Sequence, residues 1–404
     1  MQFVFFLIYV VAVLTCGSIK VGPYSLRIYM SLLMLAYLLV FRRPASEKVY
    51  IIRTDYIILF LVCIVMLGIS LTINGGLVAF AFWEKCLAYY LLCIIIYFAT
   101  DRFVKNNTHF DKLAFILSLI VVFDTVVTIL QYQNNPIGWG LGAIFSDVEE
   151  FAEFLNDHDS FVGVSKLPGI FGHPVNNGFF LSVVCPMMLT GIGNNKSFFR
   201  VLYFISVIVL TLIGLLLLQQ RAAFFLVVII VAYHFLRTLI KNPVKFILPA
   251  IVIAAIVFFI IPSNTGDIEM GRLASSDNSS RTGVWNWAFA VFLDSPLFGN
   301  ILRYNQSAEY SAHNVLIDSL VDSGIVGFIP LFILYMKTVV DSLRIMLKTK
   351  NDYARVFSYS VLASMCMGMF HNTSYLTGEV IIFLSLALMF KAQCFSKKTI
   401  SYQK

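Results

Sequence analysis

A histidine and an asparagine stand side by side at His313-Asn314, directly ahead of an apolar run long enough to cross a membrane. Imidazole titrates near neutral pH, so His313 can take a proton from an attacking hydroxyl group. Two alternatives stay open for His313: orientation of that hydroxyl without proton removal, and a purely structural role. The sequence therefore offers a candidate base at the edge of an apolar segment.

Two arginines offer a site for phosphate. Arg221 stands between two apolar runs with almost no loop around it, where an unpaired charge is costly and a functional role is favoured. Arg281 follows Ser279 and Ser280, which are N-cap candidates for a helix over 282–293, and a helix N-terminus adds donors for an anion. A guanidinium group binds phosphate in a bidentate manner and stays charged. The alternatives are an arginine that reaches lipid headgroups at 221 and a solvated loop charge at 281.

The predicted helix over 282–293 contains Trp285 and Trp287, side chains suited to a membrane–water boundary, and Asp294-Ser295-Pro296 ends it. Further along, Gly324 and Gly327 are expected on one face of a continuous helix, where they permit close helix packing.

Composition fixes the class of protein that must position these residues. Of the 404 residues, 59% are hydrophobic and only 13% are charged, about half the charged fraction of a soluble protein. Backbone polar groups in lipid must be paired within the chain, so the apolar runs should be helices. We expect an all-α polytopic membrane bundle that is a single domain over 1–404. Its twelve spans are predicted at 2–19, 24–41, 56–73, 84–99, 113–131, 174–193, 199–218, 222–236, 246–262, 314–336, 356–371 and 376–391.

The distribution of basic residues orients these spans. With both termini in the cytoplasm, 21 of the 29 Lys and Arg residues fall in cytoplasmic segments, as expected for a multi-pass protein of a plasma membrane. The net charge of +7 then reflects topology and gives no reason to propose nucleic-acid binding. Asp124 and Glu379 lie inside spans and are expected to pair with polar groups in the bundle.

Two long segments fall on the outer side, an outer loop 1 over 132–173 and an outer loop 2 over 263–313. The first loop is acidic, and its apolar residues recur at helical spacing over 144–155, which predicts an amphipathic helix. His173 and the pair His371-Asn372 also face outward in this topology and are weaker candidates for the site.

Several motifs together resemble the O-antigen ligase and polymerase superfamily over residues 165–335. In the second outer loop and the span after it, these are Ser280-Arg281-Thr282 with Trp285, then Pro296 and Gly299, then His313-Asn314, nine residues and Gly324-x-x-Gly327. Upstream, they are Gly169-Ile170-Phe171-Gly172-His173-Pro174-Val175-Asn176-Asn177 and Gln220-Arg221-Ala222-Ala223. Gln220 stands where the family commonly has serine, and Asn300 where a second glycine is common.

The resemblance implies transfer of a glycan from an undecaprenyl diphosphate to a sugar hydroxyl, on the outer (periplasmic) face of a bacterial inner membrane, with no metal or cofactor. The implied catalytic residues are His313, Arg221 and Arg281, and the implied substrate-binding residues are Asn314, Arg303, Gln220, His173, Asn177 and Trp285. The expected partners are the lipid-linked donor, a glycan or lipid A core acceptor, membrane lipid and a chain-length regulator protein.

The acidic first loop favours a repeat-unit polymerase over the alternative, an O-antigen ligase that joins the glycan to lipid A core. A twelve-span transporter or lipid-linked sugar flippase, and a non-catalytic assembly subunit, are further alternatives. Major-facilitator transporters, however, have their long connections in the cytoplasm, whereas the long segments here are external.

Overall fold

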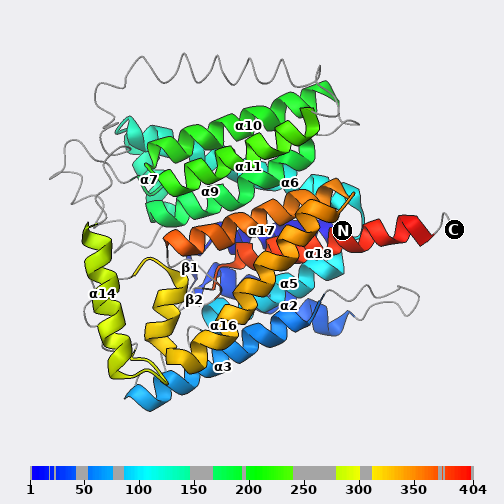
Figure 1. Ribbon diagram of the computed structural model, residues 1–404. Helices are drawn as coiled ribbons and strands as arrows, with labels where there is room; N and C mark the ends of the chain where they lie inside the picture. Colours follow the sequence, from blue (N-terminus) through cyan, green and yellow to red (C-terminus); the bar gives the residue numbers. More distant parts are fainter. Residues whose placement is uncertain are drawn as a thin grey trace. The chain divides into compact units, whose positions relative to one another are not determined.

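The computed structural model describes residues 2–17, 19–21, 24–41, 53–75, 86–145, 167–192, 197–239, 279–300, 312–371, 375 and 378–401 (Figure 1). Within these ranges the chain is almost entirely helical. The only strands in them are the two-residue β1 (Lys20–Val21) and β2 (Tyr24–Ser25), which pair antiparallel in a hairpin. The all-α prediction is confirmed for this part of the chain.

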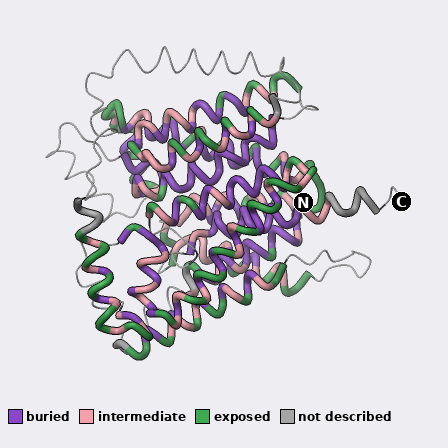
Figure 2. The backbone as a smooth tube through the Cα atoms, in the orientation of Figure 1, coloured by how far each residue is buried: buried purple, intermediate pink, exposed green. Residues whose placement is uncertain are grey.

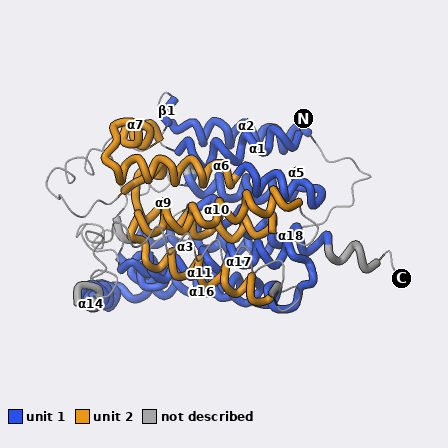
Figure 3. Tube along the Cα trace, turned by 90° about the horizontal axis from the view of Figure 1, so that it is seen from above, with its two compact units in different colours: residues 1–116, 279–404 blue, residues 117–278 orange. Residues whose placement is uncertain are grey.

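The contacts divide the chain into two compact units, Met1–Ile116 with Ser279–Lys404 and Leu117–Asn278, coloured separately in Figure 3. The boundary falls inside α6 (Asn107–Tyr132). The helices of the first unit are α1 (Gln2–Thr15), α2 (Leu26–Val40), α3 (Asp55–Gly75), the π-helix η1 (Cys86–Tyr90), α5 (Leu91–Phe103), α14 (Ser279–Asp294), α16 (Val315–Lys348), α17 (Asp352–Phe370) and α18 (Val380–Ser401).

The second unit contains the rest of α6 together with α7 (Pro136–Phe145), α9 (Pro174–Met188), the 3-10 helix η2 (Leu189–Gly191), α10 (Phe198–Leu217) and α11 (Arg221–Leu239). Within it, α9 packs against both α10 and α11. Every residue of α9 from 177 to 188 is buried, and Figure 2 colours this helix accordingly.

Helices lie at eleven of the twelve predicted spans, and the remaining span, 246–262, lies outside the described residues. Four described helices, α3, α6, α10 and α16, are long and apolar enough to cross a membrane. The chain is therefore a helical, membrane-type protein, and the count of twelve stays a prediction. Of the amphipathic helix predicted over 144–155, only the first two residues are described, and they end α7.

The core of the first unit is built around α18, which packs against α5 and α17. Every residue from 380 to 392 is buried, including Lys391, whose Nζ lies 2.8 Å from the Asp101 Oδ1 on α5. Both partners of this ion pair are buried, so loss of either one would leave an uncompensated charge. The pair therefore fixes how α5 and α18 align.

A second polar cluster joins the start of α3 to α16. The buried Asp341 carboxylate accepts hydrogen bonds from Arg53 Nη1 at 2.6 Å and from the Tyr56 hydroxyl at 2.7 Å. Burial alone would lower the pKa of Arg53, but the carboxylates of Asp341 and Asp55 together outweigh it and raise the pKa above its ordinary value. Arg53 therefore stays charged as the partner of Asp341 and Asp55.

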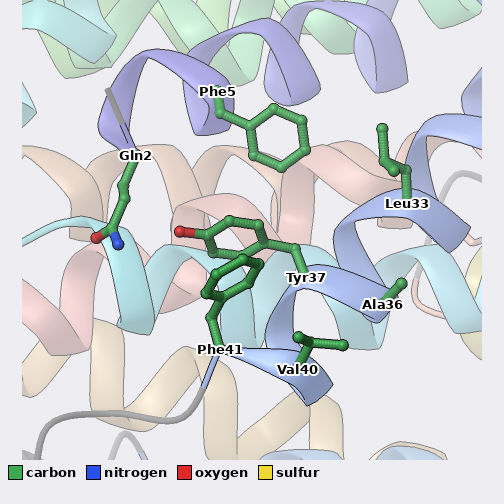
Figure 4. Close-up of a pocket in the computed structure, with 7 residues that line it drawn as sticks. All are labelled: Gln2, Phe5, Leu33, Ala36, Tyr37, Val40 and Phe41. Carbon is green, nitrogen blue, oxygen red and sulfur yellow. The ribbon is translucent and has the colours of Figure 1, made fainter.

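An apolar groove of about 780 Å³ lies between α1 and α2. It is lined by Gln2, Phe5, Leu33, Ala36, Tyr37, Val40 and Phe41 (Figure 4). None of the predicted site residues lies on α1 or α2. Its walls are mainly apolar, with the Gln2 amide and the Tyr37 hydroxyl as polar groups, and none of the residues considered above lines it.

Candidate functional site

His313 is presented to solvent by an unusual backbone conformation. Its φ angle is +50°, in the left-handed region that side chains other than glycine seldom adopt, and its side chain is exposed. The residues on either side, Ala312 and Asn314, are buried. The left-handed turn thus directs one imidazole out of a segment that is otherwise packed into the protein.

Both polar groups of the Ala312 backbone are held by partners. Its N–H donates to Asp318 Oδ1 at 3.0 Å, and its carbonyl accepts from Trp285 Nε1 at 2.9 Å. Asp318 lies in the first turn of α16, whereas Trp285 lies on α14. Ala312, the residue before His313, is therefore fixed from two elements, which explains how an unfavourable conformation persists at His313.

Asn314 fixes the chain on the other side of His313. Its Oδ1 accepts from the N–H groups of Leu316 and Ile317 at 3.0 and 3.3 Å, so it is the N-cap of α16. Its Nδ2 donates to the Met369 carbonyl at 3.2 Å, which ties the start of α16 to the end of α17. Asn314 and Trp285, both predicted to bind substrate, thus have structural partners beside His313.

The helix α14 confirms the predicted helix over 282–293 and ends at Asp294, as expected. Ser279 and Ser280, predicted as caps, lie inside its first turn. Ala288 and Val291 of α14 pack against Ala312 and Val321 in a buried apolar cluster, and Trp287 contributes from the side. This packing is what carries Trp285 to the Ala312 carbonyl. The backbone of Arg281 lies in the first turn of α14, while its side chain and all of Arg303 lie outside the described residues.

The expectation that Gly324 and Gly327 share one face of a continuous helix is wrong. α16 breaks at Gly324, whose φ of +61° and ψ of −167° are non-helical, so 315–323 and 325–348 are separate helical segments. The break exists because another part of the backbone lies against it: a Cβ on Gly324 would overlap the Leu297 carbonyl oxygen. Only glycine fits such a close approach.

The turn after α14 satisfies the backbone groups that the break leaves without helical partners. The N–H groups of Ile325 and Val326 donate to the carbonyls of Pro296 and Leu297 at 2.9 and 3.2 Å. In the opposite direction, Asn300 N–H donates to the Val321 carbonyl at 2.8 Å. Buried backbone polar groups need such partners, so the turn and the broken helix form one structure.

In the second unit, Arg221 opens α11 directly after a tight turn. α10 ends in a Schellman motif, with hydrogen bonds from Gln220 N–H to the Leu215 carbonyl at 3.2 Å and from Gln219 N–H to the Leu216 carbonyl at 3.0 Å. Gln219 is left-handed with a φ of +55°, as this motif requires. Arg221 is therefore held at the tip of a helical hairpin and is half-buried.

Gln220 packs against α9. A Cβ on Gly178 would stand 2.7 Å from Gln220 Cγ, so glycine at 178 makes room for the Gln220 side chain. The preceding residue, Asn177, is fully buried and donates from Nδ2 to Asp124 Oδ1 at 3.1 Å. The structure thus brings together Gln220 and the 177–178 segment, and it confirms that Asp124 pairs within the bundle.

The segment ahead of α9 is a built turn. Gly169 has a φ of +58°, and its N–H and carbonyl are bound by the two ends of the Gln131 amide at 2.9 and 3.2 Å. Ile170 N–H donates to Asp124 Oδ1 at 3.0 Å. His173 follows as the N-cap of α9, with Nδ1 accepting from Val175 N–H at 3.1 Å. The Nδ1 of His173 therefore has a structural role as the cap of α9.

Several residues that position the candidate site are not evident as site residues from sequence. Asp318 could have been found, because an acidic residue four positions after an asparagine N-cap is a helix-start signal. Gln131 and Ser70 gave no such signal. The Ser70 hydroxyl on α3 lies within hydrogen-bond reach of the Phe298 and Asp322 carbonyls, which bracket the turn and the break.

The sequence predicts His371 as an outward-facing and weaker candidate for the site. The structure places its ring 6.4 Å from that of His313, centroid to centroid, with the ring planes nearly perpendicular at 79°. Among the described residues, no three His, Cys, Asp or Glu side chains gather as a group of metal ligands.

Comparison with known proteins adds one match. Residues 206–332 match the model of the O-antigen ligase family, a segment that includes Arg221, Arg281 and His313. A search of the curated proteins found no match. The apolar helices and this match together show an integral membrane protein with a glycan-related function. The resemblance to the O-antigen ligase and polymerase superfamily seen in the sequence is thereby confirmed over residues 206–332, which are similar to the O-antigen ligase family.

Proposed function

We propose that the protein transfers a glycan from a polyprenyl diphosphate to a sugar hydroxyl, on the outer face of a bacterial inner membrane. The observation that carries this proposal is the presentation of His313. The backbone of His313 is left-handed, its imidazole is exposed, and the residues on either side of it are fixed by hydrogen bonds. His313 also lies within the segment that matches the O-antigen ligase family. A structural histidine would not need a strained backbone that turns it outward.

In the proposed reaction, the acceptor hydroxyl attacks the anomeric carbon of the donor glycan. His313 takes the hydroxyl proton as the new glycosidic bond forms. The bond between the anomeric carbon and the diphosphate oxygen breaks, and its electron pair leaves with the polyprenyl diphosphate. The proton then passes from His313 to solvent, which returns the base to its starting state.

The leaving group develops negative charge, and the two arginines are assigned to it. The sequence motifs are the ground for this assignment, and each of Arg221 and Arg281 would bind diphosphate oxygens through its guanidinium group. Gln220 and Asn177 would support this site through the packing of α11 on α9. Two permanent cations suffice for a diphosphate, so we expect transfer to continue in the presence of a chelator.

The role of His313 is tested by His313→Ala in purified protein, with lipid-linked glycan extracted from the producing cells as donor. We expect the variant to be stabilised against heat by this donor as the wild type is, but to transfer glycan at least about a hundredfold more slowly. Leu293→Ala, which removes an exposed side chain from α14, is the matched control and should transfer normally. Loss of donor-induced stabilisation in His313→Ala would instead assign His313 to the diphosphate site.

The acceptor decides between two forms of this reaction. We place repeat-unit polymerase first, because the outer loop 1 is acidic and would repel a heavily phosphorylated lipid A core. In a deletion strain, a missing polymerase leaves single repeats attached to the core, whereas a missing ligase leaves long polymer on the carrier lipid. Analysis of the surface and lipid-linked glycans separates the two, and stranded long chains would make the ligase the right assignment.

A further inference from the structure

A second imidazole faces the proposed base. His371 caps the C-terminal end of α17, where its N–H donates to the Met367 carbonyl at 2.9 Å. Asn314, directly after His313, donates to the Met369 carbonyl two residues before His371. The start of α16 and the end of α17 are thus joined by a hydrogen bond, and the two histidines are the residues that flank this junction.

The spacing of the two rings suits a small polar group between them. Their centroids lie 6.4 Å apart with the planes at 79°, so the rings meet edge to face and do not stack. A nitrogen of an imidazole lies about 1 Å from the ring centroid, and a hydrogen bond from it to an oxygen adds about 2.9 Å. An oxygen bound by both rings therefore lies about 4 Å from each centroid, and a centroid separation of 6.4 Å allows this. One hydroxyl oxygen beside the line that joins the two centroids then has both imidazoles as partners.

We propose that His371 is a second acceptor-binding residue, which holds the acceptor sugar hydroxyl against His313. This inference rests on the proposed function and adds a contact to it. The acceptor O–H donates to the unprotonated nitrogen of His313, and the protonated nitrogen of His371 donates to the same oxygen. One lone pair of that oxygen is then left to attack the anomeric carbon.

Only His313 gains a proton in the reaction. The acceptor oxygen forms the new bond to the anomeric carbon, and the electron pair of the breaking bond leaves on the diphosphate. His371 keeps its proton throughout and acts by orienting the nucleophile, a contribution that is lost when the reacting atoms are misplaced. A residue in this role affects transfer and leaves donor binding alone.

The experiment uses the full-length protein in lipid nanodiscs, with lipid-linked glycan extracted from the producing cells as the probe. We expect His371→Ala to be stabilised by the donor like the wild type and to transfer glycan about tenfold more slowly, the scale of one hydrogen bond to a reacting group. His371→Gln, which can still donate a hydrogen bond, should recover part of the rate. Phe370→Leu is the matched control, because it changes an exposed side chain in the same helix turn.

The double variant His313→Ala/His371→Ala separates a shared acceptor site from a structural effect. If both residues hold one hydroxyl, the double variant transfers no more slowly than His313→Ala alone. Losses that multiply, a wild-type rate for His371→Ala, or a fall in donor binding without rescue by glutamine would each overturn the inference. Failure of the proposed function is distinct, because then the wild-type protein itself would transfer no glycan.

Discussion

At the scale of single residues, different neighbours of His313 fix the chain on its two sides. Asn314 caps α16 with its side-chain oxygen and reaches α17 with its nitrogen, while Trp285 and Asp318 hold the two ends of the Ala312 peptide. These residues shape the site without needing to touch a substrate. Of the motif residues His313, Asn314 and Trp285, only His313 is therefore a candidate reacting group, and the other two hold its surroundings in place.

Arg221 lies at the tip of a hairpin whose turn is formed by main-chain hydrogen bonds. Unlike those of Asn314 and Trp285, its side chain is therefore not expected to be needed for the fold. We predict that Arg221→Ala abolishes glycan transfer while the protein still accumulates in the membrane. Arg221→Lys should remain poor, since an ammonium group cannot replace a bidentate fork. Transfer by membranes from each strain, with immunoblotting for protein amount, measures both effects.

Arg237 provides the control for this prediction. It lies in the last turn of the same helix, α11, and its Nη1 is 3.4 Å from the Tyr233 hydroxyl. Arg237→Ala should keep most of the transfer activity. Full activity of Arg221→Ala would show that this arginine only anchors the helix at the membrane surface.

At the scale of elements, the break in α16 is the feature that organises the first unit. The turn at 296–300 lies in it, α3 reaches it through Ser70, and the short segment 315–323 leads from it back to His313. A one-residue change at Gly324 would therefore disturb the turn after α14 as well as α16.

We predict that Gly324→Ala destabilises the protein. The backbone conformation alone would cost about 1–3 kcal/mol with a side chain present, and the Cβ would also overlap the Leu297 carbonyl oxygen. Gly283→Ala is the matched control, because no neighbouring atom lies within 4 Å of the place that a Cβ would take there, and alanine favours a helix by about 0.5–1 kcal/mol. Thermal unfolding in detergent should give a lower midpoint for the first variant and an equal or higher one for the second. Equal midpoints for Gly324→Ala and wild type would contradict the break.

The sequence predicts those elements that depend on local patterns. Apolar runs placed the helices, and Asp294-Ser295-Pro296 correctly marked the end of α14. The break in α16 could not be read in this way, because glycine is also common in continuous membrane helices. Its cause is contact with the backbone of Leu297, which belongs to the turn after α14. Likewise, Asn177 resembles a substrate ligand in the motif, and only the fold shows its amide buried against Asp124.

At the scale of the whole molecule, orientation decides which face carries the proposed chemistry. The distribution of Lys and Arg predicts that Lys350 lies in the cytoplasm and α14 outside. In a background without native cysteines, Leu293→Cys should react with a membrane-impermeant thiol reagent in intact cells. Lys350→Cys should react only after the cells are opened. The reverse pattern would place the His313 region on the wrong side for an outer-face transferase.

The left-handed backbone at His313 lowers the stability of the protein at the position on which the proposed activity depends. Glycine would occupy that position with less strain, so histidine is held there at a cost of about 1 kcal/mol or more. Substitutions that relieve the backbone strain at His313 are therefore expected to raise the stability of the protein and to remove the reacting group. A selection for thermostability that does not also test transfer is therefore expected to enrich substitutions at His313.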